Sequence, residues 1–264
     1  MKSSNKSSYT PAKTVQKAFS LLEMLGEKQS LHPSELAEGL RLSRSNVYRL
    51  LSTLESMGYV EKSYDSKFNL SFKVFMLGNN VPRRIQILNI SHATMSHLAK
   101  VYQENVNLGI MYQQEVLYID QIESPYPLKL NQPVGTTDPL NCTALGKVLL
   151  AGLTDRELET FLRSRKLISF TKNTITEPGK LLAKIQKVKR QGYAMDLEET
   201  HYGIHCIAAP ILDSSNKVIA GLSISAPSVR LTKQKMKGLI GPLIATSKEI
   251  SKKWTGIFSP MSFS

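Results

Sequence analysis

The sequence predicts an α+β fold in two domains, an N-terminal winged helix-turn-helix domain and a C-terminal domain of strands flanked by helices. Three observations predict this fold. Apolar residues recur at helical spacing through most of residues 15–57, a strand–turn–strand pattern follows at residues 59–70, and strand-like and helical patterns are mixed after residue 104. The chain has 264 residues, 41% of them hydrophobic, which is enough for two cores.

The sequence divides into four segments. Residues 1–12 are rich in Ser and Lys without an apolar run, so we expect a disordered tail rather than a signal peptide. Residues 13–80 form the predicted winged helix-turn-helix domain. A Gly-Asn-Asn-Val-Pro break follows, and residues 81–103 form the predicted linker helix region, with its helix at about 85–103. Residues 104–264 form the C-terminal domain.

Three helices are predicted in the first domain. The first ends at Gly26, and its inward face consists of Val15, Ala18, Phe19, Leu22 and Leu25. Pro33 suits the first turn of a short second helix. Ser43 fits the N-cap of a third helix that runs to about Met57, before Gly58, with an apolar stripe of Val47, Leu50, Leu51 and Leu54. Residues 59–62 and 68–70 then form the two strands of a small wing.

In the second domain, Thr154 and Glu157 form the capping box of one helix. The predicted strands are residues 106–112, 116–122, 128–131, 193–196, 204–212 and 218–225. The predicted helices are residues 142–153, 155–165 and 177–191, with a final helix after Thr232 that meets Pro242.

The charge and the cysteines limit the class of protein. A formal net charge of +13 favours a polyanionic partner, double-stranded DNA above all, although the basic residues are not concentrated in the first domain. No apolar run is long enough to span a membrane. The two cysteines, Cys142 and Cys206, form no C-x-x-C pair, which excludes a zinc ribbon and favours a reducing cytoplasm.

The third helix carries the predicted DNA contacts. With its apolar stripe facing inward, its outer face and edges present Arg and Asn near the N-terminus, and no acidic residue lies between Glu38 and Glu55. Such a face can enter a groove lined by phosphates and donate to base edges. The alternative is a polar helix face that binds protein. The predicted DNA-binding residues are Arg44, Ser45, Asn46, Tyr48 and Arg49, with Lys62 and Lys67 in the wing.

Several stretches resemble the IclR family of bacterial transcription regulators. Residues 43–54 and 58–60 resemble its recognition helix and the entry to its wing; residues 139–151, 174–176, 192–199, 203–210 and 223–227 resemble the blocks of its second domain. The resemblance covers nearly the whole chain after the tail. It implies a winged helix-turn-helix domain joined by a linker helix to a GAF-like effector-binding domain, in a homodimer or homotetramer. Within the family the chain looks most like the regulators of sugar-acid catabolism, the KdgR and YiaJ types.

The effector site implied by the resemblance begins at a helix start. Asn141, Cys142, Thr143 and Ala144 open a helix with small and polar residues, and its free amides suit a carboxylate, although an ordinary capped helix is the alternative. Asp196 can accept hydrogen bonds from ligand hydroxyls. The full implied set is Cys142, Thr143, Ala144, Leu145, Asp196, Ile204, Cys206, Ser223 and Ser225. The family usually has Arg where this chain has His205, which leaves the role of that residue open.

No metal and no cofactor is expected. His201 and His205 are four residues apart, but Gly203 and the strand pattern after Ile204 argue against the helix that would bring them together. Two other functions stay open beside a metabolite-controlled regulator of a catabolic operon. One is a redox-responsive regulator that uses Cys142 and Cys206. The other is an enzyme with a sensor-like domain, although no known catalytic motif supports it.

Overall fold

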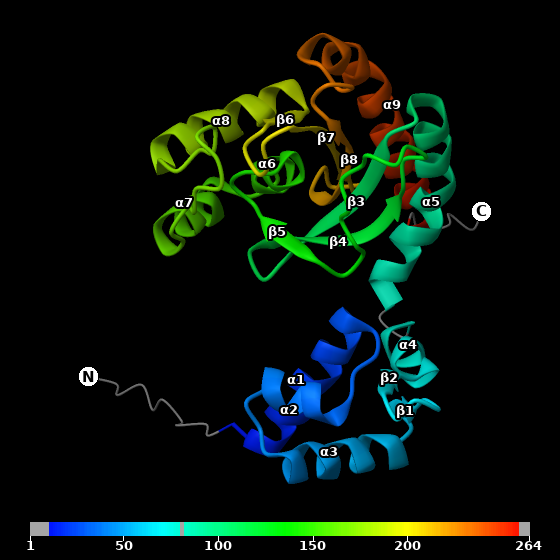
Figure 1. The fold of residues 1–264 in the computed structure, drawn as a ribbon. Helices are drawn as coiled ribbons and strands as arrows, with labels where there is room; N and C mark the ends of the chain where they lie inside the picture. Colours follow the sequence, from blue (N-terminus) through cyan, green and yellow to red (C-terminus); the bar gives the residue numbers. More distant parts are fainter. Residues whose placement is uncertain (1–10, 80–81, 259–264) are drawn as a thin grey trace, which may run out of the picture. The chain divides into compact units, whose positions relative to one another are not determined.

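The computed structural model describes residues 11–79 and 82–258, so the predicted tail lies almost wholly outside the described residues. The chain divides into two compact units, the first ending at Arg83 and the second starting at Arg84. Figure 1 shows both units, and each is described by itself.

The first unit has three helices, a two-stranded antiparallel hairpin and a fourth short helix: α1 (Lys13–Lys28), α2 (Pro33–Gly39), α3 (Arg44–Ser56), β1 (Val60–Lys62), β2 (Phe68–Leu70) and α4 (Phe72–Asn79). Its core is built by the inward faces of the first three helices, with Leu21, Leu36 and Val47 fully buried. Leu31 and Phe68 form an isolated bridge that ties the hairpin to the segment before α2. The order of elements is that of a winged helix, as predicted.

The predicted end of α1 was wrong, and its predicted inward face was correct only in part. The helix passes through Gly26 and ends after Lys28, where Gln29 has a left-handed backbone with φ of 63°. Leu25 is buried and Ala18 and Leu22 pack against the core as predicted, whereas Val15 and Phe19 are more than half exposed and the unpredicted Leu21 is fully buried. The helix has apolar residues on two sides, and only the side with Leu21 and Leu25 faces α2 and α3, so apolar spacing alone did not identify the inward face.

The helix α4 was not predicted. The sequence has an apolar run there without an inward stripe, and we expected the chain to break after the wing. In the structure α4 is short and its large side chains are exposed, with Phe72 at 84% and Phe75 at 66% of their full accessibility. Their rings contact each other edge to face at a centroid distance of 6.5 Å. An exposed apolar helix of this kind is unusual on an isolated domain.

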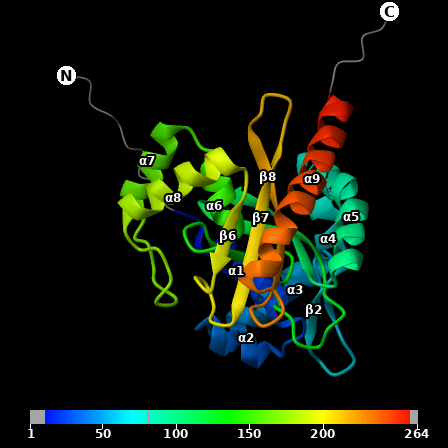
Figure 2. The same cartoon turned by 90° about the horizontal axis from the view of Figure 1, so that it is seen from above.

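The second unit begins with α5 (Pro82–Tyr102) and contains a six-stranded antiparallel sheet in the order β5-β4-β3-β8-β7-β6. Four further helices belong to it (Figure 2). The strands are β3 (Asn105–Tyr112), β4 (Glu115–Ile122), β5 (Thr137–Pro139), β6 (Ala194–Leu197), β7 (Ile204–Leu212) and β8 (Val218–Pro227). The helices are α6 (Ala144–Ala151), α7 (Asp155–Ser164), α8 (Pro178–Gln191) and α9 (Lys233–Phe258).

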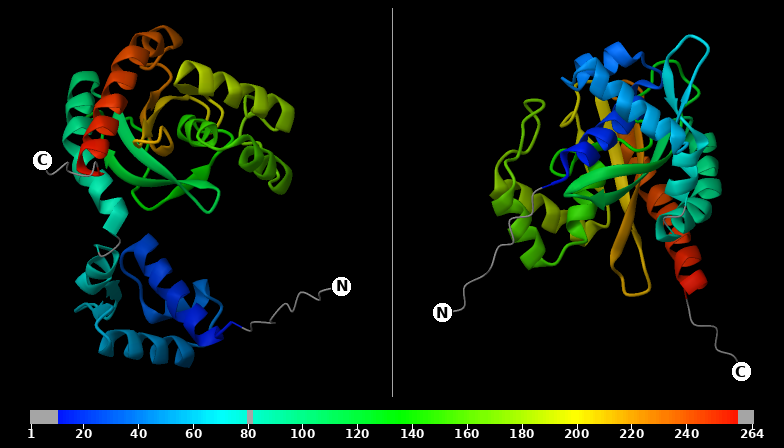
Figure 3. Two further views of the ribbon diagram at one scale, coloured as in Figure 1. Left: turned by 180° about the vertical axis from the view of Figure 1, so that it is seen from behind. Right: turned by 90° about the horizontal axis from the view of Figure 1, so that it is seen from below.

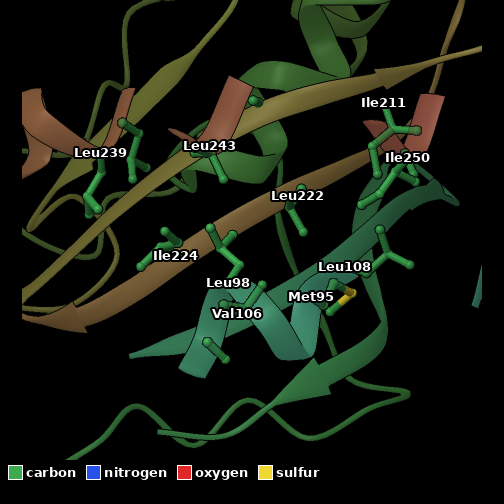
Figure 4. Close-up of a cluster of buried hydrophobic side chains, with 14 of the residues drawn as sticks. Met95, Leu98, Val106, Leu108, Ile211, Leu222, Ile224, Leu239, Leu243 and Ile250 are labelled. Atoms are coloured by element: carbon green, nitrogen blue, oxygen red, sulfur yellow. The ribbon is translucent and has the colours of Figure 1, made fainter. Parts of the chain in front are cut away.

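Both faces of the sheet are covered by helices. On one face α5 and α9 lie side by side and bury Met95, Leu98 and Leu243 against the strands, as Figures 3 and 4 show. On the other face α6, α7 and α8 pack over residues such as Val116 and Ala208. Neighbouring residues of one strand alternate between the two cores. The α+β prediction is confirmed.

One strand was predicted in the wrong place. Residues 128–131 form no strand, while β5 pairs with β4 a few residues later. The reason is local: the carbonyl of Leu130 accepts a hydrogen bond from the side chain of Asn105 instead of joining a ladder. The capping box of α7 was predicted correctly, since Thr154 Oγ1 accepts from the Glu157 amide at 3.3 Å and the Thr154 amide donates to Glu157 Oε2 at 2.9 Å. Pro242 lies inside α9.

Membrane insertion through a helix finds no support in the described residues. Among residues 11–79 and 82–258, no helix combines the length and the apolar character needed to cross a bilayer.

Candidate functional site

The outer face of α3 is a polar, solvent-exposed surface. Arg44, Ser45, Tyr48 and Arg49 are exposed and Asn46 is half-buried, while the opposite stripe is buried in the core. Arg49 Nη2 donates to Asn46 Oδ1 at 3.1 Å, so the two side chains hold each other in place on this face. The helix starts where predicted, at Ser43, whose hydroxyl accepts from the Asn46 amide at 3.4 Å.

The hairpin next to α3 carries the two predicted wing lysines. Lys62 is exposed on β1. Lys67 lies 3.4 Å from Asp65, a contact that offsets part of its charge. The tip of the hairpin presents Tyr64, which is fully exposed and which the sequence analysis missed. An exposed aromatic in a turn gives no periodic signal, so only its position on the folded wing makes it visible.

The second unit contains a narrow cavity between the sheet and α6. About 340 Å³ of it is free of atoms, but the centre of a water molecule can occupy only about 20 Å³. Eight of the nine predicted effector residues line it: Thr143, Ala144, Leu145, Asp196, Ile204, Cys206, Ser223 and Ser225. The ninth, Cys142, is fully buried outside the lining. Six lining residues were missed: Tyr118, Leu130, Gln132, Asp138, Thr200 and His201.

Strand register brings the polar lining residues to one face of the sheet. Asp196 is directly opposite Cys206, and Cys206 is opposite Ser225. On the other half of the sheet, Asp138 is opposite Val116, which lies two residues before Tyr118 on β4. Directly paired residues share a face, as do residues two apart. The polar row therefore reaches both edge strands, β6 and β5.

A pair of glycines lets α6 pack closely on the sheet. Gly109 of β3 and Gly221 of β8 are direct partners. A Cβ at Gly221 would lie 2.8 Å from Leu145 Cδ2, and one at Gly109 would lie 3.1 Å from Leu145 Cδ1. Leu145 therefore fills the space that side chains at these positions would occupy. The close approach holds the start of α6 at the cavity wall.

The start of α6 is capped but keeps two free donors. Thr143 Oγ1 accepts from the Gly146 amide at 2.9 Å and donates to the Pro139 carbonyl at 3.1 Å. The amides of Ala144 and Leu145 precede Gly146, and within the described residues neither has a protein acceptor. Free amides at a helix start carry positive potential, which suits an anion.

A buried ion pair supports the loop that follows Asp196. Lys147 is completely buried, and its Nζ lies 2.6 Å from Glu199 Oε1 and donates to the Met195 carbonyl at 3.1 Å. Asp196 accepts from the Glu199 amide at 2.7 Å and from the Thr200 hydroxyl at 3.0 Å. Burial raises the pKa of Asp196 and of Glu199, and nearby Lys147 opposes the rise at both. Lys147 was missed because it interrupts an otherwise apolar helix.

A second polar group stands at the β5 edge of the cavity. Asp138 Oδ2 accepts from the Tyr118 hydroxyl at 2.9 Å and from Gln132 Nε2 at 3.0 Å. Tyr118 and Gln132 are both buried. Burial raises the pKa of Asp138, and the negative charge of Asp196 adds to the rise, while the hydrogen bond from Tyr118 and the proximity of His201 lower it.

Asn107 lies behind the two serines. Its Nδ2 donates to Ser225 Oγ at 3.2 Å and to Ser223 Oγ at 3.4 Å. Both serine oxygens therefore act as acceptors toward Asn107, so each hydroxyl can still donate its own proton, although that of Ser225 also interacts with the Cys206 thiol. The Oδ1 atom of Asn107 is buried and has no hydrogen-bond partner among the described residues.

The cysteines and His205 have other roles. Both cysteines are free thiols, and burial raises the pKa of Cys142 to about 12 and that of Cys206 even further. Such thiols are poor nucleophiles and oxidise slowly. The buried His205 ring bonds the Leu231 carbonyl through Nδ1 at 2.8 Å, tying β7 to the segment before α9. No group of metal-ligating side chains occurs in residues 11–79 and 82–258.

Comparison with known proteins identifies the family. Residues 14–63 match the IclR helix-turn-helix domain, and residues 80–252 match the bacterial transcriptional regulator IclR C-terminal domain. The chain belongs to the IclR family. It is 34% identical over 239 residues to the HTH-type transcriptional regulator KdgR of Escherichia coli (strain K12), covering 90% of this chain and 91% of that protein. The suggested likeness to KdgR is thereby confirmed.

Two solved structures share the fold. The IclR crystal structure from Thermotoga maritima has a TM-score of 0.79 and 32% identity, covering 92% of this chain and 99% of that one. An IclR homologue from Microbacterium hydrocarbonoxydans, solved in complex with 4-hydroxybenzoate, has a TM-score of 0.83 at 20% identity, covering 92% and 99%. This IclR-family chain is thus a DNA-binding transcription regulator with an effector-binding C-terminal domain, and the family is one of regulators rather than enzymes.

Proposed function

We propose that this regulator controls a catabolic operon in the cytoplasm and senses a small carboxylate, a sugar acid or a keto acid. The observation that carries the proposal is the start of α6, where the free amides of Ala144 and Leu145 belong to residues that line the cavity. The Microbacterium homologue was solved in complex with 4-hydroxybenzoate, which is itself a carboxylate, and this supports the ligand class.

The ligand would lie with its acid group at the start of α6. The hydroxyls of Ser223 and Ser225, supported by Asn107, would donate to its oxygen atoms. Asp196 would face the hydroxyl-bearing end, since two carboxylates side by side repel. Because the cavity holds little more than one water molecule, side chains around it must move apart to admit an acid of several carbons.

The DNA would contact α3 and the wing. We assign Arg44, Ser45, Asn46, Tyr48 and Arg49 to base edges and nearby phosphates, and Lys62 and Lys67 to flanking phosphates. The ion pair of Lys67 with Asp65 makes its contribution the smaller of the two.

A homodimer or homotetramer would bind an inverted repeat. The first unit has an apolar groove of about 670 Å³ lined by residues such as Val15, Phe19, Met57 and Leu77, three of which are more than half exposed, besides the exposed rings of α4. We assign this surface to contact with a second copy of the chain, because a two-fold pair of winged helices reads two half-sites. Footprinting that finds a single asymmetric site would contradict this part of the proposal.

The test of the ligand uses the full chain. A panel of sugar acids and keto acids is screened for thermal stabilisation, since bound ligand raises stability with occupancy. The best ligand is then titrated calorimetrically into the parent and Asp196→Asn, with exposed Asp155→Asn as the control. We expect Asp196→Asn to weaken effector binding at least tenfold and to leave operator affinity unchanged. Undiminished effector binding, or an effector that is a cation, would contradict the pocket assignment.

The redox alternative has a separate measurement. A regulator switched by Cys142 and Cys206 would lose free thiols when exposed to mild peroxide. Because Cys142 is buried, Cys206 is half-buried and the pKa of each thiol is raised, we expect an unchanged thiol count in the folded protein.

A further inference from the structure

We propose that Asp138, held in place by Tyr118 and Gln132, is a second subsite of the cavity that binds hydroxyl groups, so that the effector is a polyhydroxylated carboxylic acid rather than a plain keto acid. The inference rests on the proposed function, because it assumes that the acid group lies at the start of α6. It narrows the ligand class that was left open above.

Asp138 lies on an edge strand of the sheet and lines the cavity. Asp138 comes from β5 and Asp196 from β6, which are the two edge strands of the sheet. Both residues line the same cavity, and the start of α6 and the serines of β8 form other parts of its wall. The ligand therefore meets a carboxyl group from each edge strand. A ligand with one terminal acid group and several hydroxyls along its chain can donate to both carboxyl groups.

Asp138 and Tyr118 both have hydrogen-bond acceptor capacity that the described part of the protein does not use. Asp138 Oδ2 already accepts two hydrogen bonds, whereas Oδ1 has no hydrogen-bond partner among the described residues. The only proton of the Tyr118 hydroxyl is donated to Asp138, so its oxygen can still accept. Asp138 Oδ1 and the Tyr118 oxygen are therefore unused acceptors, and only a hydrogen-bond donor on the ligand can pair with them. Hydroxyl groups are such donors, while the keto and carboxylate oxygens of a keto acid can only accept.

The alternative is that Asp138 only ties the 130–138 segment to β4. Substitution by Asn separates the two roles. Asn keeps an oxygen that can accept from Tyr118, but it replaces one acceptor by an NH₂ donor. A purely structural tie would then affect all ligands alike. A hydroxyl subsite would lose hydroxylated ligands selectively.

The experiment compares two matched ligand series on the full-length protein by calorimetry. One series is glycerate, threonate, xylonate and gluconate, and the other is the 2-oxo acids of three to six carbons without hydroxyls. We expect affinity to rise along the hydroxylated series and to exceed that of the 2-oxo acid of equal length. Asp138→Asn should weaken the best hydroxylated acid about 10- to 100-fold, as for a lost hydrogen bond to a charged group, and leave 2-oxo acids within about twofold.

Two variants guard against a folding defect. Tyr118→Phe keeps the buried ring and removes the hydroxyl, so it should reduce the same preference by a smaller factor. Glu115→Gln changes a carboxylate on β4 that does not line the cavity and pairs with Arg165 at 3.7 Å, and it should change nothing. Thermal melting of each variant checks the fold.

The outcomes separate this inference from the proposed function. If 2-oxo acids bind best and depend on Asp196 but not on Asp138, the second subsite is wrong and the carboxylate site stands. If Asp138→Asn weakens both series equally, Asp138 is only a structural tie. If affinity for 2-oxo acids rises with falling pH and this rise requires Asp138, the carboxyl acts as a protonated donor and the inference fails. If no acid of either series binds, the proposed function fails with it.

Discussion

The outer face of α3 and the cavity of the second unit differ in how they are built. The proposed DNA-binding face lies on one continuous helix, and most of its side chains are exposed to solvent. The cavity draws its lining from strands as far apart as β5 and β6, from α6 and from two loops, and most of its polar residues are buried. A helix face is readable from spacing alone, whereas a cavity depends on strand register and on loops that close over it.

The two sites also use charge differently. The first two turns of α3 carry Arg44 and Arg49 without a carboxylate, so we expect DNA binding by this face to weaken as the salt concentration rises. The cavity contains Asp138 and Asp196, and its nearby buried cation, Lys147, is bound to Glu199. We therefore expect effector recognition in the cavity to depend on individual hydrogen bonds rather than on net charge.

Arg49→Ala should nearly abolish operator binding without unfolding the protein. Arg49 is exposed and is oriented by Asn46, so its loss opens no core. A bidentate base contact contributes about 1–3 kcal/mol, and a dimer would lose it twice. Mobility-shift titration at fixed salt measures the loss, with exposed Arg163→Ala in the second unit as the charge-matched control. A folded Arg49→Ala protein with parental affinity would contradict the assignment of α3.

Lys147→Met should destabilise the second unit by about 3–5 kcal/mol, because it leaves the Glu199 carboxylate buried without its cation. Urea unfolding followed by the fluorescence of Trp254, the only tryptophan in the chain, measures the free energy. The double variant Lys147→Met/Glu199→Met should recover most of the loss, since an apolar pair can replace a buried ion pair. A double variant as unstable as the single one would show that Lys147 acts through other contacts.

The elements predicted best from the sequence have local chemical signals. The capping box at Thr154 located the start of α7, and Ser43 located the start of α3. The order of helices and wing also followed from spacing and turn residues. By contrast, β5 and α4 were missed, because a three-residue edge strand and an exposed apolar helix have no periodicity that distinguishes them.

In the candidate site, too, the residues that were predicted have a local or family signal, and those that were missed do not. Thr143, Ala144 and Leu145 lie together on one helix, and family resemblance supplied Asp196 and the serines of β8. Tyr118, Gln132 and Asp138 come together only because β4 pairs with β5 and because the 130–136 segment folds over the cavity. Lys147 was hidden in an apolar run whose spacing predicts only a buried helix. Long-range register, not local sequence, determines these contacts.

Mild acid should stabilise the second unit. Burial raises the folded-state pKa of Asp138, Asp196 and Glu199 above their ordinary range. The folded chain then holds protons that the unfolded chain has released, so the free energy of unfolding is highest near the ordinary carboxyl pKa of about 4 and falls as pH rises through the raised values. Hydrogen bonds from Thr154 lower the pKa of Glu157, so its contribution is lost only in a separate window at lower pH.

Urea unfolding at a series of pH values, followed by the fluorescence of Trp254, measures the slope of the free energy of unfolding against pH. Asp138→Asn and Asp196→Asn should each flatten it, because amides do not titrate. Exposed Asp155→Asn should leave it unchanged. If the change in stability between about pH 4 and 7 is as large in a protein carrying both substitutions as in the parent, Asp138 and Asp196 are not among its sources.

The smallest expected effects come from the two N-caps, which make the same bond in different surroundings. Ser43 is exposed and accepts from the Asn46 amide at 3.4 Å, whereas Thr143 is buried, accepts from Gly146 at 2.9 Å and also donates to Pro139. Ser43→Ala should cost about 0.5 kcal/mol and Thr143→Ala about 2 kcal/mol, the low and high ends for cap removal. Amide hydrogen exchange of peptides from α3 and α6 measures each loss locally, with Thr143→Ser as the control that keeps both bonds.

Thr143 also positions the free amides of α6. Thr143→Ala should therefore weaken effector binding, while Ser43→Ala should leave effector binding unchanged. If Ser43→Ala and Thr143→Ala lower the stability of their helices equally, burial does not strengthen the N-cap at Thr143.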